Sequence, residues 1–358
     1  MWRRWVRRSS GLIAVAMMAF LAVTPMGCYL SRAAYEEAKI LKRRQPIERL
    51  VTHPTTEPAL RAKLALVLEA RQFAIDSLQL KAGDSFTTYS ALDRDTLVLV
   101  LSAAYRDRLE RKTWWFPVVG RFPYKGFFDF DGAQQTAESL RADGFDVVVG
   151  PSSAFSTLGW FNDPLVSTTV KQDSVTLVNT VLHELLHSTF FAKGSVSFNE
   201  SFASFVGGRG AEHFFRARGD SVALQRARAE WHDDRLLGAF WERTARELDS
   251  AFAAYPDSVS TTASAQRLVA RDSIYEAARR RLIDSVGPQL QTYPAGWVQR
   301  VPLNNAVLLA RRVYAERLDR FDSVYTANDG NLPRAIREVI RMREDSVRVA
   351  KAEGDREQ

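Results

Sequence analysis

The sequence predicts an α+β fold that is mostly helical, with a small mixed sheet packed on the helix that carries an HExxH pattern. Three observations support this prediction: long stretches with apolar residues at helical spacing, few and short β-rich runs, and the position of HExxH inside an apolar helix. The chain has 358 residues, and 46% of them are hydrophobic, which suffices for a large core. This composition excludes a disordered chain, a collagen and a disulfide-stabilised scaffold.

Charge gives no indication of nucleic-acid binding. The whole chain has 49 Lys and Arg against 42 Asp and Glu, a formal charge of +7. Four of these bases, Arg3, Arg4, Arg7 and Arg8, precede residue 28, so the remainder has 45 bases against 42 acids. A chain this close to neutral is not a dedicated nucleic-acid binder.

The first 27 residues have the form of a signal peptide. A basic leader, Met1–Arg8, precedes a short apolar run, and Gly27 stands directly before Cys28, the chain's single cysteine. A cysteine in this position indicates a bacterial lipoprotein that is lipidated on Cys28 and held at the membrane, facing the periplasm, with the outer membrane favoured. An uncleaved signal anchor and a plain secretory signal are the alternatives. All three place the mature chain outside the cytoplasm.

Up to residue 164 the pattern alternates between helices and short strands. In chain order we expect helices at Tyr29–Arg44 and Pro58–Leu80, a β-rich run at Thr96–Ala104, loop or strand at Trp114–Gly126, a helix at Gly132–Ala142, and a buried strand at Asp146–Val149 that leads into a loop, Gly150–Pro164. The helix from Pro58 opens with a proline, which suits a first helical turn.

The remainder is predicted to be helical. Asp173 or Ser174 can cap a helix that ends at Lys193-Gly194. A second helix begins around Ser197–Asn199 and weakens at Gly207-Gly208, and helix resumes from Ala211 to about Glu353, with breaks near Pro256, Gly287–Gly296 and Asp329–Pro333. We expect a single domain over 28–353: a helical N-terminal part (28–82), a central part with the HExxH pattern (about 83–215), a helical C-terminal part (about 216–353), and a tail (354–358).

The pattern itself is His183-Glu184-Leu185-Leu186-His187. Histidines four residues apart share one helix face and can bind a single metal ion, and Glu184 is offset from His183 by about 100°. Neutral imidazoles suit zinc, which lowers the pKa of its bound water toward about 7. Glu184 could then act as the general base on this metal-activated water and later protonate the leaving amine. The alternative is a pair of structural histidines in a buried helix.

Glu200, within Phe198–Ala203, is the predicted third metal ligand. The chain reverses at Gly194, so the start of the second helix can return beside the first. In the alternative interpretation, Ser197–Glu200 is an S-x-x-E capping box, and Glu200 accepts a hydrogen bond from the Ser197 amide. His213 is a rival third ligand.

With Asn199-Glu200 downstream of the HExxH pattern, His183–Ala203 resembles a bacterial family of zinc-dependent aminopeptidases, which are gluzincin-like lipoproteins. The resemblance covers roughly residues 27–340 and includes Gly27–Tyr29, Arg43–Ile47, Thr87–Tyr89, Lys112–Trp114, Phe116–Val118, Tyr124–Gly126, Ser156–Phe161, Lys193-Gly194, Leu303–Ala306 and Tyr314. It implies a zincin-like metallopeptidase fold, zinc bound by His183, His187 and Glu200, and Glu184 as catalytic base.

Three features depart from the family's pattern. Trp115 and Arg121 occupy positions where the family usually has cysteines, so a disulfide between them is absent here. Gly207-Gly208 stands where relatives carry a charged segment. Pro25-Met26-Gly27 is an atypical sequence before a lipidated cysteine.

Substrate binding is expected from the segment before the HExxH helix. Asp146–Gly150 leads into Ser156, Thr157, Leu158, Gly159 and Trp160, and we expect this segment to line the cleft and to pair with an extended peptide as an added strand. The alternative is an ordinary turn packed by Trp160 and Phe161.

Peptide hydrolysis also needs a hydrogen-bond donor for the developing oxyanion. The candidates are Tyr314, Tyr124, Tyr89, His213 and His232, and Tyr314 is favoured because it follows the matching Asn304-Asn305 segment. An aminopeptidase also needs an anionic subsite for the substrate's ammonium, and no acidic cluster near the motif is visible in the sequence.

The sequence thus predicts a membrane-tethered, zinc-dependent peptidase, by resemblance an aminopeptidase, that acts on peptides at the cell envelope. The alternatives are a zinc endopeptidase, a hydrolase of non-peptide amides, and a non-catalytic envelope lipoprotein that uses its helical C-terminal region as an interaction scaffold.

Overall fold

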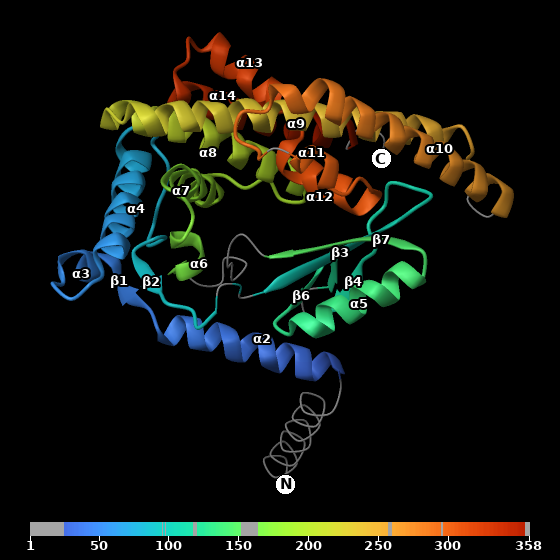
Figure 1. Cartoon of the computed structure of the whole chain (residues 1–358). Coiled ribbons are helices and arrows are strands. Elements are labelled where there is room, and N and C mark those ends of the chain that lie inside the picture. The colour runs from blue at the N-terminus through green and yellow to red at the C-terminus, as the bar shows by residue number, and fades with distance from the viewer. Residues whose placement is uncertain are drawn as a thin grey trace, which may run out of the picture.

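The computed structural model describes residues 25–354 except 95, 97, 117–119, 152–163, 257–259 and 295 (Figure 1). Its helices are α2 (Pro25–Lys42), α3 (Ile47–Thr52), α4 (Pro58–Asp76), α5 (Phe130–Ala142), α6 (Ser167–Val170), α7 (Ser174–Thr189), α8 (Val196–Arg218), α9 (Ser221–Ala253), α10 (Thr261–Arg281), α11 (Trp297–Arg300), α12 (Asn305–Ala315), α13 (Leu318–Ala327) and α14 (Leu332–Gly354), with the short helices η1 (Leu282–Val286) and η2 (Gly287–Gln289). Its strands are β1 (Gln45–Pro46), β2 (Thr88–Ser90), β3 (Leu99–Tyr105), β4 (Trp114–Phe116), β5 (Gly120–Phe122), β6 (Lys125–Phe127), β7 (Phe145–Pro151) and β8 (Leu165–Val166). The predicted α+β fold with mostly helical content is confirmed.

The longest strands form an antiparallel sheet in the order β6-β3-β7. Helices α5 and α12 lie on opposite sides of this sheet (Figure 1). Ala133, Ala137 and Leu140 of α5 pack against Leu101 and Val147 of the strands. Strand β7 pairs with β3 alone among the described strands, so it is an edge strand, as the peptide-pairing hypothesis for this segment requires.

The mixed sheet is a second, smaller one, in the order β1-β2-β8, with β1 antiparallel and β8 parallel to β2. Tyr89 of β2 and Leu165 of β8 belong to the same core cluster as Leu182 and Leu186 of α7. The β3 sheet instead packs on α5 and α12. Its apolar side chains form a separate core cluster with those of α5.

Helix α8 runs unbroken through Gly207 and Gly208, so the predicted weakening there is wrong. A Cβ on Gly207 would lie 2.1 Å from Asn179 Oδ1 of α7, and a Cβ on Gly208 would lie 2.6 Å from the Trp231 ring of α9. The missing side chains therefore allow α7 and α9 to approach α8 closely. Packing with neighbouring helices outweighs the low helix propensity of glycine, roughly 1 kcal/mol per residue.

The chain breaks at three places where continuous helix was expected: at Gly219, at residues 301–304 between α11 and α12, and after Ala315. The first and the last of these carry a positive φ. Helix α8 ends at Gly219, whose φ of +75° is the left-handed conformation that glycine adopts readily. Helix α12 ends at Ala315, and Arg317 also has a positive φ, of 55°. These two breaks turn the chain back over the helical core.

The aromatic stretch Trp114–Gly126 contains β4, β5 and the start of β6. Trp115 and Arg121, the two positions where the resemblance expects cysteines, are direct cross-strand partners in the β4–β5 hairpin. Their side chains therefore lie on the same face of a hairpin, where a pair of cysteines could meet.

A buried polar network fixes α12 to the β3 sheet. Asp146 Oδ2 of β7 accepts hydrogen bonds from the Asn305 backbone N–H at 2.8 Å and from Arg271 Nη2 at 2.5 Å. Asn305 Oδ1 in turn accepts a hydrogen bond from the Tyr275 hydroxyl at 2.7 Å. Buried and largely satisfied, this network sets the position of the helix that carries Tyr314.

The N-terminal targeting prediction falls almost wholly outside the described residues. Cys28 lies in the first turn of α2, and residues 1–24 precede the described part of the chain. Within the described residues, none of the helices combines the length and the apolar character that crossing a bilayer requires.

Candidate metal centre

Helix α7 forms where its N-cap and its apolar stripe predict. The Asp173 carboxylate accepts hydrogen bonds from the backbone N–H groups of Val175 and Thr176, which are otherwise unpaired donors of the first turn. Val178, Val181, Leu182, Leu185 and Leu186 are buried on one face. His183 and His187 flank that face, each partly exposed, and point toward α8.

The turn between α7 and α8 is held by Asn199. This side chain is 2% exposed, accepts a hydrogen bond from the Ala192 backbone N–H and donates one to the Ala192 carbonyl, both at 2.9 Å. Gly194 provides the reversal with a φ of +76°. Because Asn199 immediately precedes Glu200, this clamp also fixes the position of the carboxylate.

Glu200 and the two histidines meet between the helices. Glu200 Oε2 lies 3.3 Å from His183 Nε2, and Glu200 Oε1 lies 3.6 Å from His187 Nε2. One ligand atom from each residue falls within 4.8 Å of the others, so a single ion between them could contact all three. The capping-box interpretation of Ser197–Glu200 is not the arrangement seen, because α8 begins at Val196 and the carboxylate faces the histidines.

The electrostatics of this group favour a charged carboxylate. Burial opposes ionisation of Glu200, but hydrogen bonds and the charges of His183 and His187 hold its pKa at about 2. Burial acts to lower the pKa of His187, but the Glu200 hydrogen bond and the charges of Glu200 and Glu184 raise it on balance. His187 Nδ1 is buried, with no hydrogen-bond partner among the described residues, whereas Nε2 faces Glu200 and is the atom that this ring offers to a ligand.

Two tyrosines and Glu184 adjoin the metal-ligand candidates. The Tyr314 ring of α12 is centred 6.3 Å from the His183 ring. Partial burial of this half-exposed side chain, followed by the charges of Glu200 and Glu184, raises the pKa of Tyr314 to about 12. Burial and the charge of Glu200 also raise the pKa of Tyr124, from the turn before β6. Both phenols are therefore protonated donors at neutral pH, and both lie near the group of three.

Ser201 connects the helix of Glu200 to the helix of Tyr314. Its hydroxyl is fully buried, donates to the Val313 carbonyl at 3.0 Å and accepts from the Glu316 backbone N–H at 2.8 Å. Sequence analysis missed this role because the contact spans more than one hundred residues. Asn199 is easier to select from the sequence because it directly precedes Glu200, but its hydrogen bonds to Ala192 across the α7–α8 turn were not predicted.

The other candidate donors and ligands lie elsewhere. His213 Nε2 pairs with the Tyr325 hydroxyl at 2.8 Å, and burial lowers the His213 pKa to about 4. His232 lies beside Asp233, and Tyr89 is buried on β2, where it is hydrogen-bonded to Ser167. None of these three joins the His183, His187 and Glu200 group. The expected substrate segment, Ser156–Trp160, lies outside the described residues.

Comparison with known proteins assigns the family. A family model described as "Putative aminopeptidase" matches residues 28–352. The chain belongs to this family. No curated protein and no solved structure matches the chain. The family name indicates peptidase activity, and the family match covers nearly all of the described residues.

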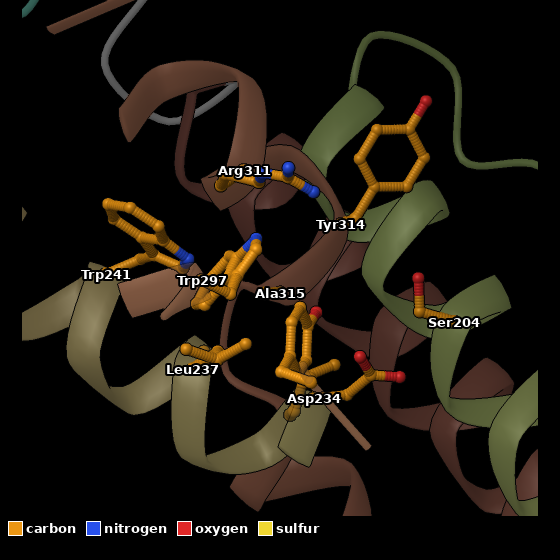
Figure 2. Close-up of a pocket in the computed structure, with 11 residues that line it drawn as sticks. Ser204, Asp234, Leu237, Trp241, Trp297, Arg311, Tyr314 and Ala315 are labelled. Atoms are coloured by element: carbon orange, nitrogen blue, oxygen red, sulfur yellow. The ribbon is translucent and has the colours of Figure 1, made fainter. Parts of the chain in front are cut away.

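A cavity of about 110 Å³ adjoins the metal-ligand group of this aminopeptidase-family chain (Figure 2). Ser204 of α8, Asp234 of α9, and Arg311 and Tyr314 of α12 line it. Tyr314 therefore borders both the cavity and the His183 ring. Ser204 lies one turn after Glu200 and donates a hydrogen bond to its carbonyl, so cavity and ligand group are neighbours along α8.

Proposed function

We propose that this protein is a zinc-dependent peptidase, with aminopeptidase action as the family name indicates. One observation carries the proposal: His183, His187 and Glu200 present two imidazole nitrogens and one carboxylate oxygen within 4.8 Å of one another, beside Glu184. Two histidines and one glutamate form a ligand set that leaves a position open for chemistry.

Zinc fits the donor set. Imidazole and carboxylate ligands suit zinc, and its abundance favours it over manganese, iron or cobalt. The low pKa of Glu200 keeps this ligand charged, and His187 directs its Nε2 atom toward the Glu200 carboxylate, where an ion would lie. When bound, the ion would supply Lewis acidity to the water and to the scissile carbonyl.

The roles of the protein groups follow from their chemistry and position. Glu184 would take the proton from the attacking water and deliver it to the departing amine. Tyr314, with its pKa raised to about 12, would keep its proton and donate a hydrogen bond to the oxyanion. Tyr124 is the second donor candidate, because it too is close enough to Glu200 for that charge to raise its pKa. Ser201 acts as a positioning residue, because it ties the helix of the carboxylate to the helix of the phenol.

Support for an extended peptide in the cleft comes from β7. Among the described strands only β3 pairs with it, so its other edge offers backbone donors and acceptors that a peptide could pair with. We propose that Ser156–Trp160, which follow β7 in the sequence, contribute to binding the same peptide.

We also propose that the chain is lipidated on Cys28 and retained at the cell envelope after removal of residues 1–27. The basic leader, the apolar run and the small residue before Cys28 support this. Metabolic labelling with palmitate should mark the wild type and not Cys28→Ala, and the Cys28→Ala protein should leave the membrane fraction. Equal labelling of both would contradict lipidation at this residue.

The decisive experiment measures metal and hydrolysis together. Elemental analysis of the purified wild type should find about one zinc per chain, and Glu200→Ala should lose most of it. Glu184→Gln should keep the zinc and lose activity by a factor of at least about 10³, since the general base is gone. A wild type without tightly bound metal would favour the scaffold alternative instead.

The substrate panel separates the remaining alternatives. Amino-acid anilides report aminopeptidase action, and internally quenched peptides with blocked ends report endopeptidase action. Hydrolysis of the anilides alone would support the aminopeptidase assignment. A zinc-loaded chain that cleaves neither would point to a non-peptide amide as substrate.

A further inference from the structure

The cavity near the three candidate ligands is lined by a carboxylate, Asp234, that has no ion-pair partner among the described residues. Asp233 and Asp234 are adjacent on α9 but differ in their contacts. Asp233 is fully buried and accepts hydrogen bonds from the Gln291 and Thr292 backbone N–H groups and from the Thr292 hydroxyl. It is a structural residue that holds the loop before α11. No hydrogen bond or ion pair joins Asp234 to any residue in the described part of the chain, and its carboxylate lines the cavity.

The environment of Asp234 is unfavourable for its charge. Burial, with the nearby negative charges of Glu230 and Asp233, raises the pKa of Asp234 to about 7, and Arg311 only partly opposes this. Arg311 is an exposed side chain at the same cavity and forms no ion pair with the Asp234 carboxylate. An acid kept in such a place without a partner costs stability, and a cationic ligand would remove that cost.

Aromatic rings complete the lining. Trp241, which is 2% exposed, and the Tyr293–Trp297 pair, with ring centroids 4.3 Å apart, line the cavity together with Asp234. In Figure 2 the Asp234 carboxylate points toward the helix that carries Ser204, and Trp241 and Trp297 lie on its other side. An acid beside aromatic faces is suited to an ammonium or guanidinium group, which gains from both.

We propose that this cavity is a specificity pocket that binds a cationic group of the substrate peptide next to the scissile bond, with Asp234 as its counter-charge. The inference rests on the proposed peptidase function. Ser204 is one helical turn, about 6 Å, from Glu200, so a substrate at the metal can reach the pocket with the residue that flanks the cleaved bond. The cation is either the α-ammonium or the side chain of Lys or Arg in that residue.

The test compares Asp234→Asn with Glu230→Gln in the zinc-loaded full-length protein. Glu230 is the matched control, because it lies one turn earlier on α9, is paired with Arg226 and does not line the cavity. The substrates are the anilides of leucine, lysine, N-acetyl-leucine and N-acetyl-lysine. Asp234→Asn should lower kcat/KM at least about tenfold on the cationic substrates that the wild type cleaves, and Glu230→Gln should change it less than twofold.

The pattern across substrates identifies the cation. A loss on both free-amine anilides assigns the α-ammonium, and a loss confined to the two lysine substrates assigns the side chain. The pocket assignment would be overturned if Asp234→Asn lowered kcat/KM equally on all the substrates that are cleaved. It would also be overturned if substitution of Arg311, and not of Asp234, lowered kcat/KM on the cationic substrates. Either result would leave the peptidase function standing.

A binding measurement tests the pocket without turnover. Calorimetric titration of the Glu184→Gln protein with leucinamide, lysinamide and their N-acetyl forms should show tighter binding of the cationic probes, reduced at least about tenfold by adding Asp234→Asn. Binding that is indifferent to this substitution would overturn the inference even if no hydrolysis is found. Absence of hydrolysis alone would count against the proposed function.

Discussion

The two sides of the candidate site are built in different ways. On one side, the α7–α8 corner brings His183, His187 and Glu200 together from a stretch of eighteen residues. On the other, the α9–α12 wall supplies Asp234 and Tyr314, which are eighty residues apart in sequence. The corner is held by close helix packing at Gly207 and by the Asn199 clamp, whereas the wall is held by buried polar contacts.

Because the two sides are held by different contacts, substitutions in them should affect different properties of the protein. A change in the corner alters the spacing of the metal-ligand candidates, so metal affinity and stability should fall together. A change in the wall leaves these three residues in place, so hydrolysis should fall while the metal stays. Substitutions on the two sides should therefore separate loss of metal from loss of hydrolysis.

Tyr314→Phe removes one hydrogen-bond donor from the wall. Loss of a single oxyanion donor costs roughly 10²-fold in kcat. We therefore expect kcat to fall by about that factor, with zinc content unchanged, because Tyr314 does not belong to the ligand group. Steady-state kinetics and elemental analysis on the same preparation would check this.

Tyr124→Phe is the matched control for the phenol. It removes the same hydroxyl from the other tyrosine near Glu200. If Tyr314 is the donor, Tyr124→Phe should lower kcat less than about threefold. The reverse ranking would transfer the oxyanion role to Tyr124 and to the turn before β6.

Gly207→Ala tests the corner. The new Cβ would lie 2.1 Å from Asn179 Oδ1 and 2.9 Å from the Asn179 backbone carbonyl, which cannot rotate away. Overpacking of this kind costs about 1–3 kcal/mol, and the better helix propensity of alanine returns about 1 kcal/mol. We expect a net loss of up to about 2 kcal/mol in the free energy of unfolding and weaker zinc binding, since α7 and α8 are pushed apart.

Gly210→Ala provides the comparison on the same helix. Its Cβ would meet Leu182 Cδ1 at 2.7 Å, the end of a flexible side chain that can move. Its unfolding free energy in denaturant should stay within about 0.5 kcal/mol of the wild type, with zinc retained. Equal damage from both alanines would mean that Gly207 has no special part in setting the corner.

Ser201→Ala affects the junction of the two sides. It leaves the partly buried Glu316 N–H without its acceptor, which costs roughly 1–2 kcal/mol. Because α12 loses a contact to α8, Tyr314 should be less well placed, and kcat should fall several-fold at constant zinc content. Ser201→Cys keeps a weak acceptor, so its kcat should lie between those of the wild type and Ser201→Ala. A loss of zinc in Ser201→Ala would mean that Ser201 supports the metal-ligand candidates of the α7–α8 corner.

The same contrast explains how far sequence reasoning reached. The HExxH spacing and the Asp173 cap are local, so α7 and the shared face of its histidines followed from helix geometry. Glu200 required one further inference, that the chain reverses at Gly194, and the reversal is present. The break at Gly219 and the continuity of α8 through Gly207 were not predicted, because neighbouring helices decide whether a glycine ends a helix or allows close packing.

The wall was largely inaccessible to sequence analysis. An acidic subsite was expected from aminopeptidase chemistry, but Asp234 is far from the HExxH motif in the sequence. Asp234 looks like any surface acid in a charged helix, and only the tertiary contacts that occupy Asp233 and leave Asp234 in a cavity distinguish the two. Tyr314 was favoured through the resemblance, since nothing in its own sequence neighbourhood indicates that it faces His183.

The smallest predicted effect is the contribution of Asp234 to the pH dependence of the free energy of unfolding. The pKa of Asp234 is raised to about 7 in the folded chain, against about 4 when unfolded. Between these values the native state binds more protons than the unfolded state, so the free energy of unfolding falls as pH rises from about 4 to 7. Asp234→Asn removes this dependence and should be more stable than the wild type at pH 7.5, by about 1 kcal/mol because the group is partly exposed.

This gain should disappear near pH 4.5, where the wild-type carboxyl is protonated in the folded state. The other groups around the cavity, Glu230 and Asp233 on α9, Arg311 and Tyr314 on α12, and Tyr293 in the loop, are retained in the variant and cancel in the comparison. Thermal unfolding of both proteins across this pH range would measure it. A variant that is stabler yet cleaves cationic substrates more slowly would show that the wall keeps an unfavourable charge for binding, whereas a destabilised variant would make Asp234 a structural residue like its neighbour Asp233.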